Sequence, residues 1–512
     1  MIFQKGSAQV ASLPAPIGGW NARDSIANME ALDAYELINL FPTVSNVVLR
    51  GGFDNHVTGI TGQVETLMNY SYGSTQKLFC IAGTAIYDAT NSGVVGAAVV
   101  SSLTNARWEY INVATTADNY IYLVNGVDSP LLYNGTTWLA ITAVSAIAIT
   151  GVTPTTLNNI QLFKNRVWFS QKDTLKAWYL PTSAVGGAAN LLDLRSIAKK
   201  GGYIVDIGTW TLDAGYGVDD NLVFITSNGE VIVYSGTDPA SSATWALIGV
   251  WNLGSPVGNR CLVKYAGDLL IITYDGLVPL AGALQSSRLD PRINLTNKIQ
   301  GAITDAVNAH ASKFGWQVIY LAKNNAILLN VPVSEGSSQE QYVMNTITKS
   351  WCKFQGWSAN VLEIHKDDLY FGGNGVVCKA WTGYTDNVSN IQTNVLQAFN
   401  YFEQRGVKKY FTRARPSIFT NGSPAILLSI NVDFDTTNPV SSLSFSPSSQ
   451  TLWNTALWDV DVWAQDTVIT NTWQGITGIG YCGGIHLTSS SQGIQLEWAS
   501  TDIVYQTGWA GI

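Results

Sequence analysis

Residues 222–234 read Leu-Val-Phe-Ile-Thr-Ser-Asn-Gly-Glu-Val-Ile-Val-Tyr, two apolar runs on either side of Asn228 and Gly229. Asn-Gly between runs of β-branched and aromatic residues is the strongest short signal for a β-hairpin, because both turn positions require positive φ. We therefore expect a hairpin with a two-residue turn. Residues 269–280 follow the same pattern, with Gly276 in the turn. Both glycines are predicted to adopt positive φ.

The hairpin unit recurs along the chain. Its first strands begin near residues 78, 120, 167, 222, 269 and 369, and residues 326–344 supply a further copy inside the longest gap. A period of roughly 40–55 residues built from antiparallel hairpins is typical of propeller blades. One blade cannot bury both faces of its sheet, whereas blades stacked round an axis can. The sequence therefore predicts an all-β fold with a β-propeller of six to seven blades.

Composition agrees with a folded β protein. Of 512 residues, 46% are hydrophobic and 12% are charged, and the formal net charge is -8. Such a chain is not disordered, and its acidity disfavours binding nucleic acid through the phosphates. Five cysteines without a C-x-x-C pair are expected to be small buried apolar residues. The start of the chain has no long apolar segment and no run of 18 apolar residues occurs, so we expect synthesis in the cytoplasm and no membrane span.

Three segments are expected. Residues 1–60 form an N-terminal arm and first strand, residues 61–395 form the propeller, and residues 396–512 form a C-terminal, sandwich-like β domain that makes a tip. Within the arm, residues 33–40 suggest a helical turn or two ended by Pro42.

One longer helix is predicted between blades, over residues 297–314. It places Ile299, Ile303, Ala306 and Val307 on one face, and Thr296 or Asn297 is the candidate N-cap. The helix is expected to pack on the rim of the propeller.

Five short blocks in the first third of the chain then point to a family. They are Gly19–Asp24, Ala34–Pro42, Leu49–Phe53 closing with Thr58 and Gly59, Asn125–Asp128 with Leu131, Tyr133, Asn134, Gly135 and Trp138, and Phe163–Phe169. In this order they resemble the tail nozzle proteins of short-tailed bacteriophages, also called packaged-DNA stabilisation proteins. The resemblance implies a propeller body with a β-rich tip, a homohexameric tube below the head-to-tail adaptor, and no enzymatic activity or cofactor.

From this resemblance we expect a structural protein of the virion tail, assembled in the host cytoplasm. It would be a conduit for DNA that passes the lumen without specific binding, and it would stabilise the packaged DNA. Tail fibres or a needle are further candidate partners. The lumen wall is expected to be neutral to acidic, because each phosphate neutralised by Lys or Arg would add affinity and slow passage.

Sequence support for catalysis or metal binding is weak. The four histidines, at positions 56, 310, 365 and 486, are far apart and no H-E-x-x-H occurs. The pairs Asp433/Asp435 and Asp459/Asp461 would share a strand face, yet no calcium loop accompanies them. We interpret the histidines as structural or surface residues and the aspartates as solvated, and predict no catalytic, cofactor or metal site.

The candidate site residues are instead charged residues for subunit or adaptor contacts: Arg23, Asp24, Arg50, Lys408, Lys409, Arg413 and Arg415. The first three are predicted to form one charged cluster that fixes the N-terminal segment to the propeller or to a neighbouring chain, the alternative being that each is solvated. The last four alternate with aromatic residues, a pattern also seen in nucleic-acid binding. In an acidic chain we favour Arg forks that meet carboxylates of a neighbour.

Two alternatives of other classes stay open. The 18 tryptophans could stack on sugars, which would suit a carbohydrate-binding or depolymerising tail protein. A propeller scaffold that docks peptides on one face is the other.

Overall fold

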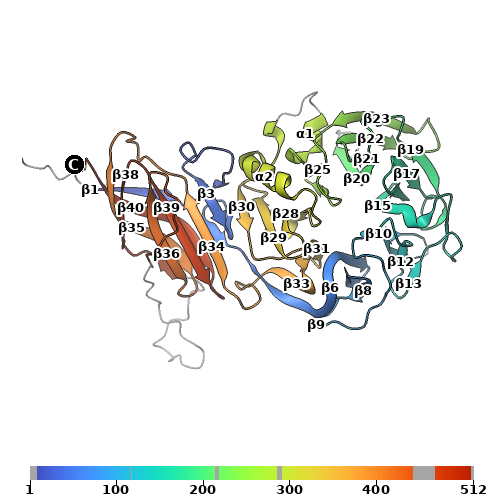
Figure 1. The fold of residues 1–512 in the computed structure, drawn as a ribbon, viewed down its shortest axis with the longest axis horizontal. Coiled ribbons are helices and arrows are strands. Elements are labelled where there is room, and N and C mark those ends of the chain that lie inside the picture. The colour runs from blue at the N-terminus through green and yellow to red at the C-terminus, as the bar shows by residue number, and fades with distance from the viewer. Residues whose placement is uncertain (1–7, 117, 214–217, 285–290, 442–467, 509–512) are drawn as a thin grey trace, which may run out of the picture.

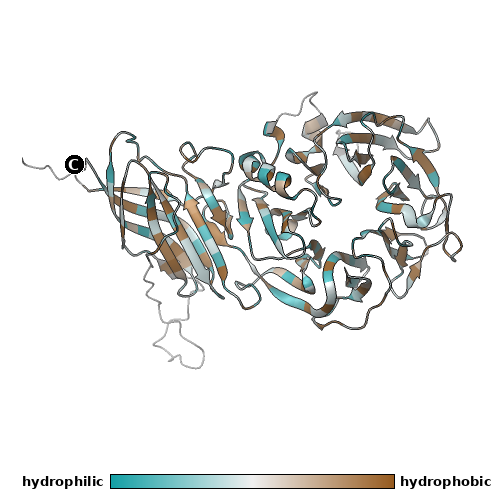
Figure 2. Cartoon of the chain, viewed as in Figure 1, coloured by the Kyte–Doolittle hydropathy of each residue, from teal (hydrophilic) through white to brown (hydrophobic). Residues whose placement is uncertain are grey.

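The computed structural model describes residues 8–116, 118–213, 218–284, 291–441 and 468–508. It has two parts that lie side by side along the long axis, a ring of small sheets and a sandwich of two larger sheets (Figure 1). Figure 2 shows that apolar residues follow the strands of both parts.

Seven sheets of the described chain surround one axis. The first strand of each sheet lies innermost, because all seven line the same central cavity. These strands are β6 (Gly52–Tyr72), β10 (Glu109–Ala114), β15 (Leu157–Phe163), β20 (Ile204–Asp213), β24 (Leu262–Tyr265), β27 (Gln317–Leu321) and β31 (Val361–His365). The predicted β-propeller is confirmed, with seven blades among the described residues.

Within each blade, the outer strands follow the inner strand in chain order, and each is antiparallel to the neighbour that precedes it in the blade. They are β7 (Thr75–Ala82), β8 (Ala85–Asp88), β11 (Asn119–Val124), β12 (Leu131–Tyr133), β13 (Trp138–Ala140), β16 (Arg166–Gln171), β17 (Lys176–Tyr179), β19 (Asn190–Asp193), β21 (Val218–Thr226), β22 (Glu230–Gly236), β23 (Trp245–Asn252), β25 (Asp268–Thr273), β26 (Gly276–Pro279), β28 (Ala326–Ser334), β29 (Ser338–Asn345), β30 (Trp351–Phe354), β32 (Asp368–Gly372) and β33 (Asn374–Thr382). Of three two-residue strands, β9 (Gly93–Val94) pairs with β6, and β14 (Ile149–Thr150) pairs with β18 (Gly187–Ala188).

Strand β6 closes the ring because it belongs to two blades. Its first half is the outer strand of the last blade, where Val57 lies opposite Val377 of β33. Its second half is the inner strand of the first blade, where Met68 lies opposite Phe79 of β7. The last blade is therefore completed by the N-terminal part of the chain.

The second part is a β-sandwich, as predicted. One sheet contains β35 (Lys409–Thr420), β37 (Val468–Thr470), β38 (Gln474–Gly480), β40 (Leu496–Thr507), β1 (Ala8–Pro14), β4 (Leu40–Pro42) and β5 (Val47–Leu49). The other contains β34 (Ile391–Gln397), β36 (Ala425–Val432), β39 (Gly483–Ser491), β3 (Asp33–Ile38) and β2 (Gly19–Trp20). Side chains such as Ile418, Leu487 and Trp498 are buried between the sheets.

The predicted boundaries need correction. Residues 1–60 are not a separate arm, because β1 pairs along its length with β40 and β3 pairs with β34. The boundary at residue 60 divides β6, and the boundary at residue 395 divides β34. Strand β3 also touches β30 at one position, so one sheet runs from the β27–β30 blade into the sandwich.

The predicted helical turn over residues 33–40 is wrong, because this segment forms β3 and the start of β4. The main partner of β3 is distant in sequence, with Leu37 opposite Val395, whereas β4 pairs locally, with Leu40 opposite Leu49. Pairing of this kind overrides a local helical pattern.

Both glycines adopt the predicted positive φ, 76° at Gly229 and 112° at Gly276. Gly276 is not in the turn as predicted, because it is the first residue of β26 and pairs with Thr273. The two-residue turn at Asn228 is wrong, since three residues, 227–229, separate the end of β21 from the start of β22, and among them only Gly229 has positive φ. A two-residue turn with both φ values positive occurs instead at 164–165.

The predicted helix is present and shorter. It consists of a 3-10 turn (Asn297–Ile299) followed by α2 (Gln300–His310), and the expected apolar face is buried. Thr296 is the N-cap residue of the 3-10 turn, but its hydroxyl makes no capping hydrogen bond and instead accepts one from the Leu277 amide. A shorter helix, α1 (Leu280–Leu284), follows β26 directly.

Candidate functional site

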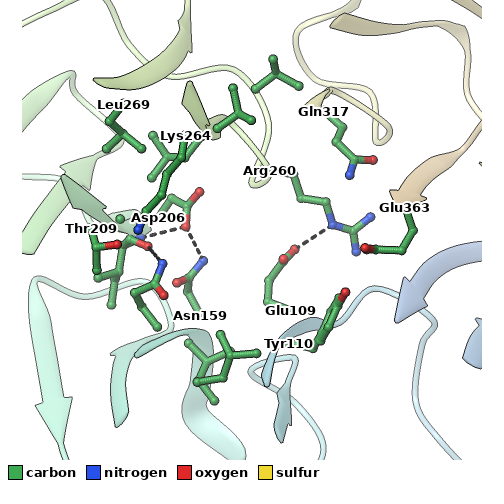
Figure 3. A pocket seen from close by; sticks show the side chains of 18 of the residues that line it. Glu109, Tyr110, Asn159, Asp206, Thr209, Arg260, Lys264, Leu269, Gln317 and Glu363 are labelled. Carbon is green, nitrogen blue, oxygen red and sulfur yellow. Dashed lines mark hydrogen bonds and ion pairs between the residues drawn. The ribbon is translucent and has the colours of Figure 1, made fainter. Parts of the chain in front are cut away.

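The propeller contains a polar central cavity of about 260 Å³ (Figure 3). Three carboxylates project from inner strands of three blades: Glu109, Asp206 and Glu363. The propeller therefore brings to one place three acids that are far apart in sequence.

Arg260, just before β24, ties blades together across this cavity. Its Nε donates to Glu109 at 3.2 Å, and its Nη1 donates to the Glu65 carbonyl at 3.0 Å. Its Nη2 donates to the Thr66 hydroxyl at 3.0 Å and to the Trp108 carbonyl at 2.9 Å. The guanidinium therefore joins the fifth blade to the first two.

Asp206 lies on the opposite side of the cavity. Its Oδ1 accepts hydrogen bonds from Asn159 Nδ2 and from the Ile207 amide, both at 2.8 Å. Burial raises the pKa of Asp206 to about 8, and the negative charge of Glu109 adds to this shift. A carboxyl with this pKa is mostly protonated at neutral pH.

Burial also raises the pKa of Glu363 to about 7, although a hydrogen bond from the Tyr110 hydroxyl opposes the shift. The pKa of Glu109 is raised by burial despite its ion pair with Arg260. The cavity thus holds three acids whose ionised forms are destabilised by burial. Acids with perturbed pKa values in a cavity are typical of functional sites.

Burial raises the pKa of the neighbouring Cys261 thiol well above its ordinary value, so the reactive thiolate is disfavoured. Among the described residues, no group of three or more potential ligands is placed to hold a metal ion.

The predicted cluster of Arg23, Asp24 and Arg50 is wrong, because these residues belong to two separate ion pairs. Arg23 binds Asp24 through two bonds of 2.8 Å at the surface. The hydrogen bond from Arg23 lowers the pKa of Asp24 to about 2. Arg50 instead pairs with Asp386, so the N-terminal segment is fixed at two places.

Arg50 is buried and hydrogen-bonded within the chain. Its Nη1 and Nη2 bind both oxygens of Asp386, at 2.8 and 2.6 Å, its Nη2 donates to the Gln355 carbonyl, and its Nε donates to Asn39 Oδ1. The guanidinium also lies over the Trp357 ring, with its carbon 5.1 Å from the ring centre. Since the side chain is 1% exposed, its prediction as a contact with another chain is corrected to an internal one.

The basic residues between positions 408 and 415 also include both internal and exposed side chains. Lys409 is fully buried and donates to three main-chain carbonyls, so it is a structural residue and not a contact. Arg415 pairs with Asp502 at 2.6 Å and lies over the Trp473 ring. Lys408 and Arg413 are exposed and remain candidates for contacts.

The other sequence interpretations have clear outcomes. All five cysteines are buried and free, as expected. His365 and His486 are buried and hydrogen-bonded, to Asn69 and to Asn394 respectively. The carboxylates of the first aspartate pair accept hydrogen bonds from nearby main-chain amides. Asp459 and Asp461 lie outside the described residues.

Sequence reasoning missed the cavity residues. A usable signal was present, because Ile204-Val-Asp-Ile and Val361-Leu-Glu-Ile each place one acid in a buried inner strand. An acid at such a position requires either a partner or a shifted pKa.

No family model matches the chain, and no curated protein matches it. BBS1N, solved in complex with ARL6DN, is similar over 66% of this chain and 99% of that chain, with 10% identity and a TM-score of 0.40. Raptor of Chaetomium thermophilum is similar over 65% of this chain and 30% of that chain, with 10% identity and a TM-score of 0.39. YCF48 bound to a D1 peptide is similar over 68% and 97%, with 9% identity and a TM-score of 0.34.

These likenesses are too distant to carry an argument about function. The class is defined by the chain's own strands: a seven-bladed β-propeller joined to a β-sandwich. No described helix is both long and apolar enough to cross a membrane.

Proposed function

We propose that the chain is a structural subunit of a phage tail nozzle. Six copies would form a tube below the head-to-tail adaptor, through which DNA leaves the head and which helps to retain it before ejection. The adaptor, and fibres or a needle, would be its partners in the virion tail. The observation that carries the proposal is the location of the family-like blocks, because the first three of them build the junction between propeller and sandwich.

The junction is held by specific polar contacts. Lys298, before α2, donates to the Gly18 carbonyl at 2.8 Å and to Asp33 at 2.5 Å. Asn21 donates to the other oxygen of Asp33 at 2.8 Å, and the Ala22 amide donates to the Lys298 carbonyl. With the Arg50–Asp386 pair, these contacts couple the two parts, which suits a subunit that resists pressure.

A ring of identical subunits needs two different patches that match each other. Two candidate patches are exposed and apolar. Leu247 and Ile248 lie on β23, and Ile479 and Tyr481 lie at and just after β38. Figure 1 places β23 and β38 at opposite ends of the long axis. Uncovered apolar side chains on sheet strands invite association.

The test is the assembly state of the full chain. Native mass spectrometry of the purified protein, alone and mixed with tailless particles, is expected to give six copies, and imaging should place them below the adaptor. The ring should bind duplex DNA weakly at low and at moderate salt. A chain that stays monomeric under both conditions, or virions that lack it, would reject the proposal.

For the carbohydrate alternative, the candidate stacking residues among the described tryptophans are the five that are partly exposed: Trp138, Trp178, Trp251, Trp381 and Trp473. Trp453, Trp458, Trp463 and Trp509 lie outside the described residues. Incubation with host surface polysaccharide is the experiment that separates the two functions.

A further inference from the structure

We propose that the central cavity of the propeller binds a small alkylammonium ion, such as a diamine, between Asp206, Asn159 and the carboxylates across the cavity. This inference goes beyond the tail function and does not depend on it. It rests on the excess of hydrogen-bond acceptors over donors in the cavity.

The acceptor excess follows from the contacts already described. Glu109, Asp206 and Glu363 present carboxylate oxygens to the cavity. The main cation, Arg260, has four of its five N–H donors engaged with Glu109 and with groups of the first two blades. Gln317, also in the wall, donates its amide to the Leu362 carbonyl. Lys264 is a second cation, on an exposed part of the wall. When Asp206 and Glu363 are ionised, the buried part of the wall therefore has more acceptors than free donors.

An independent observation points to a missing donor. Asn159 is 3% exposed and lines the cavity, yet its Oδ1 has no hydrogen-bond partner, while its Nδ2 is bound to Asp206. Figure 3 shows Asn159 and Asp206 reaching toward each other, with Arg260 and Glu109 across the opening. A buried amide oxygen without a partner is rare in folded proteins and marks a place for a donor.

The required donor is an organic cation and not a bare metal ion. The acids do not form a metal-binding group within the described chain. Beside the acids, the wall contains Leu67, Ile111, Leu269 and Val361, which would contact methylene groups. A –CH₂–NH₃⁺ group has three donors and an apolar stem, and it matches both halves of this wall.

Binding should be coupled to protons. Since burial raises the pKa values of Asp206 and Glu363, a bound cation would favour their charged forms and release protons. Affinity is therefore expected to increase as pH rises through this range. The titratable and charged groups facing the cavity are Glu109, Tyr110, Asp206, Arg260, Cys261, Glu363 and, on an exposed part of the wall, Lys264.

The experiment is calorimetric titration of the full chain with 1,4-diaminobutane at constant ionic strength. We expect one site per chain, roughly tenfold weaker binding at about pH 6 than at about pH 8, and release of protons to the buffer. The neutral isostere 1,4-butanediol should not bind. Binding by the diol, or absence of heat with the diamine at either pH, would overturn the proposal.

Variants separate a built site from general attraction to an acidic protein. Asp206→Asn should weaken diamine binding by roughly tenfold or more, because the carboxylate is lost while the shape is kept. The exposed acid Glu30, remote from the cavity lining, supplies the control Glu30→Gln, which should bind as the wild type. If Asp206→Asn does not fold, Glu363→Gln is the equivalent test. Equal affinity of the cavity variant and the control would reject the site.

Discussion

At the scale of single residues, Arg50 is the most consequential side chain of the junction. Its guanidinium is buried, and it is the charged partner of Asp386, whose side chain is 12% exposed. We predict that Arg50→Met lowers the free energy of unfolding by about 3–5 kcal/mol, because a nearly buried carboxylate loses its partner. Urea denaturation measures the effect.

The matched control is Arg23→Met, since Arg23 is also paired with an aspartate but is 45% exposed. Its loss should cost at most about 1 kcal/mol, because water and salt screen an exposed pair. Equal losses for the two variants would contradict the assignment of Arg50. In the sequence both arginines lie in family-like blocks, and nothing local tells which one is buried.

At the scale of elements, β6 is expected to govern the stability of the last blade. Val57 is 1% exposed and lies opposite Val377 in the closing strand. We predict that Val57→Asp speeds amide hydrogen exchange in β31–β33 and in β6, while β15–β17 on another side of the ring stay protected. The reason is that a buried charge without a partner destabilises the pairing between β6 and β33.

Asn55→Asp is the control for this variant, because it puts the same carboxylate on the same strand at an exposed position. Exchange in the last blade should then match the wild type. If Val57→Asp leaves exchange in β31–β33 unchanged, the closing role of β6 is wrong.

Elements with local signals were predictable and those made by distant pairing were not. The hairpins of β21 and β22 and of β25 and β26 follow from apolar runs on either side of a glycine in or beside the turn. Strand β3 was mistaken for a helical turn because its partners, β34 and β30, come more than 300 residues later. The propeller was therefore predictable from its repeat, while the junction with the sandwich was not.

At the scale of the whole molecule, the cavity should make stability depend on pH. Folding raises the pKa of Asp206 from near 4 to about 8, so within this window the folded state binds a proton that the unfolded state has lost. Stability then falls as pH rises through the window. We predict that Asp206→Asn gains stability relative to the wild type between about pH 5 and about pH 8.

Urea titrations of both proteins at matched pH values measure this difference. His56 and His365, whose pKa values are lowered by burial, affect both proteins alike and cancel. A difference that stays constant with pH would contradict the assignment. The cavity itself could not be foreseen, because only the closed ring brings together acids from the second, fourth and seventh blades.

Assembly supplies the last prediction. Ile248 on β23 is 54% exposed, and we expect Ile248→Glu to lower the proportion of hexamer while the unfolding free energy changes by at most about 0.5 kcal/mol. A carboxylate in an apolar contact must be desolvated, which weakens association. Val144, 92% exposed and outside any strand, gives the control Val144→Glu. Native mass spectrometry compares the two, and a hexamer that survives Ile248→Glu would place the contact elsewhere.

Because β6 belongs to two blades, one of its pairing partners is synthesised much later than β6 itself. The closing half of the strand is made early, whereas its partner in β33 follows about 320 residues later. At roughly 5–20 residues per second, a ribosome takes about 15–60 s to cover that distance. Throughout this interval the nascent chain carries an unmatched β edge, so the early segment is where a chaperone would be needed and where a stalled ribosome would leave a product prone to aggregation.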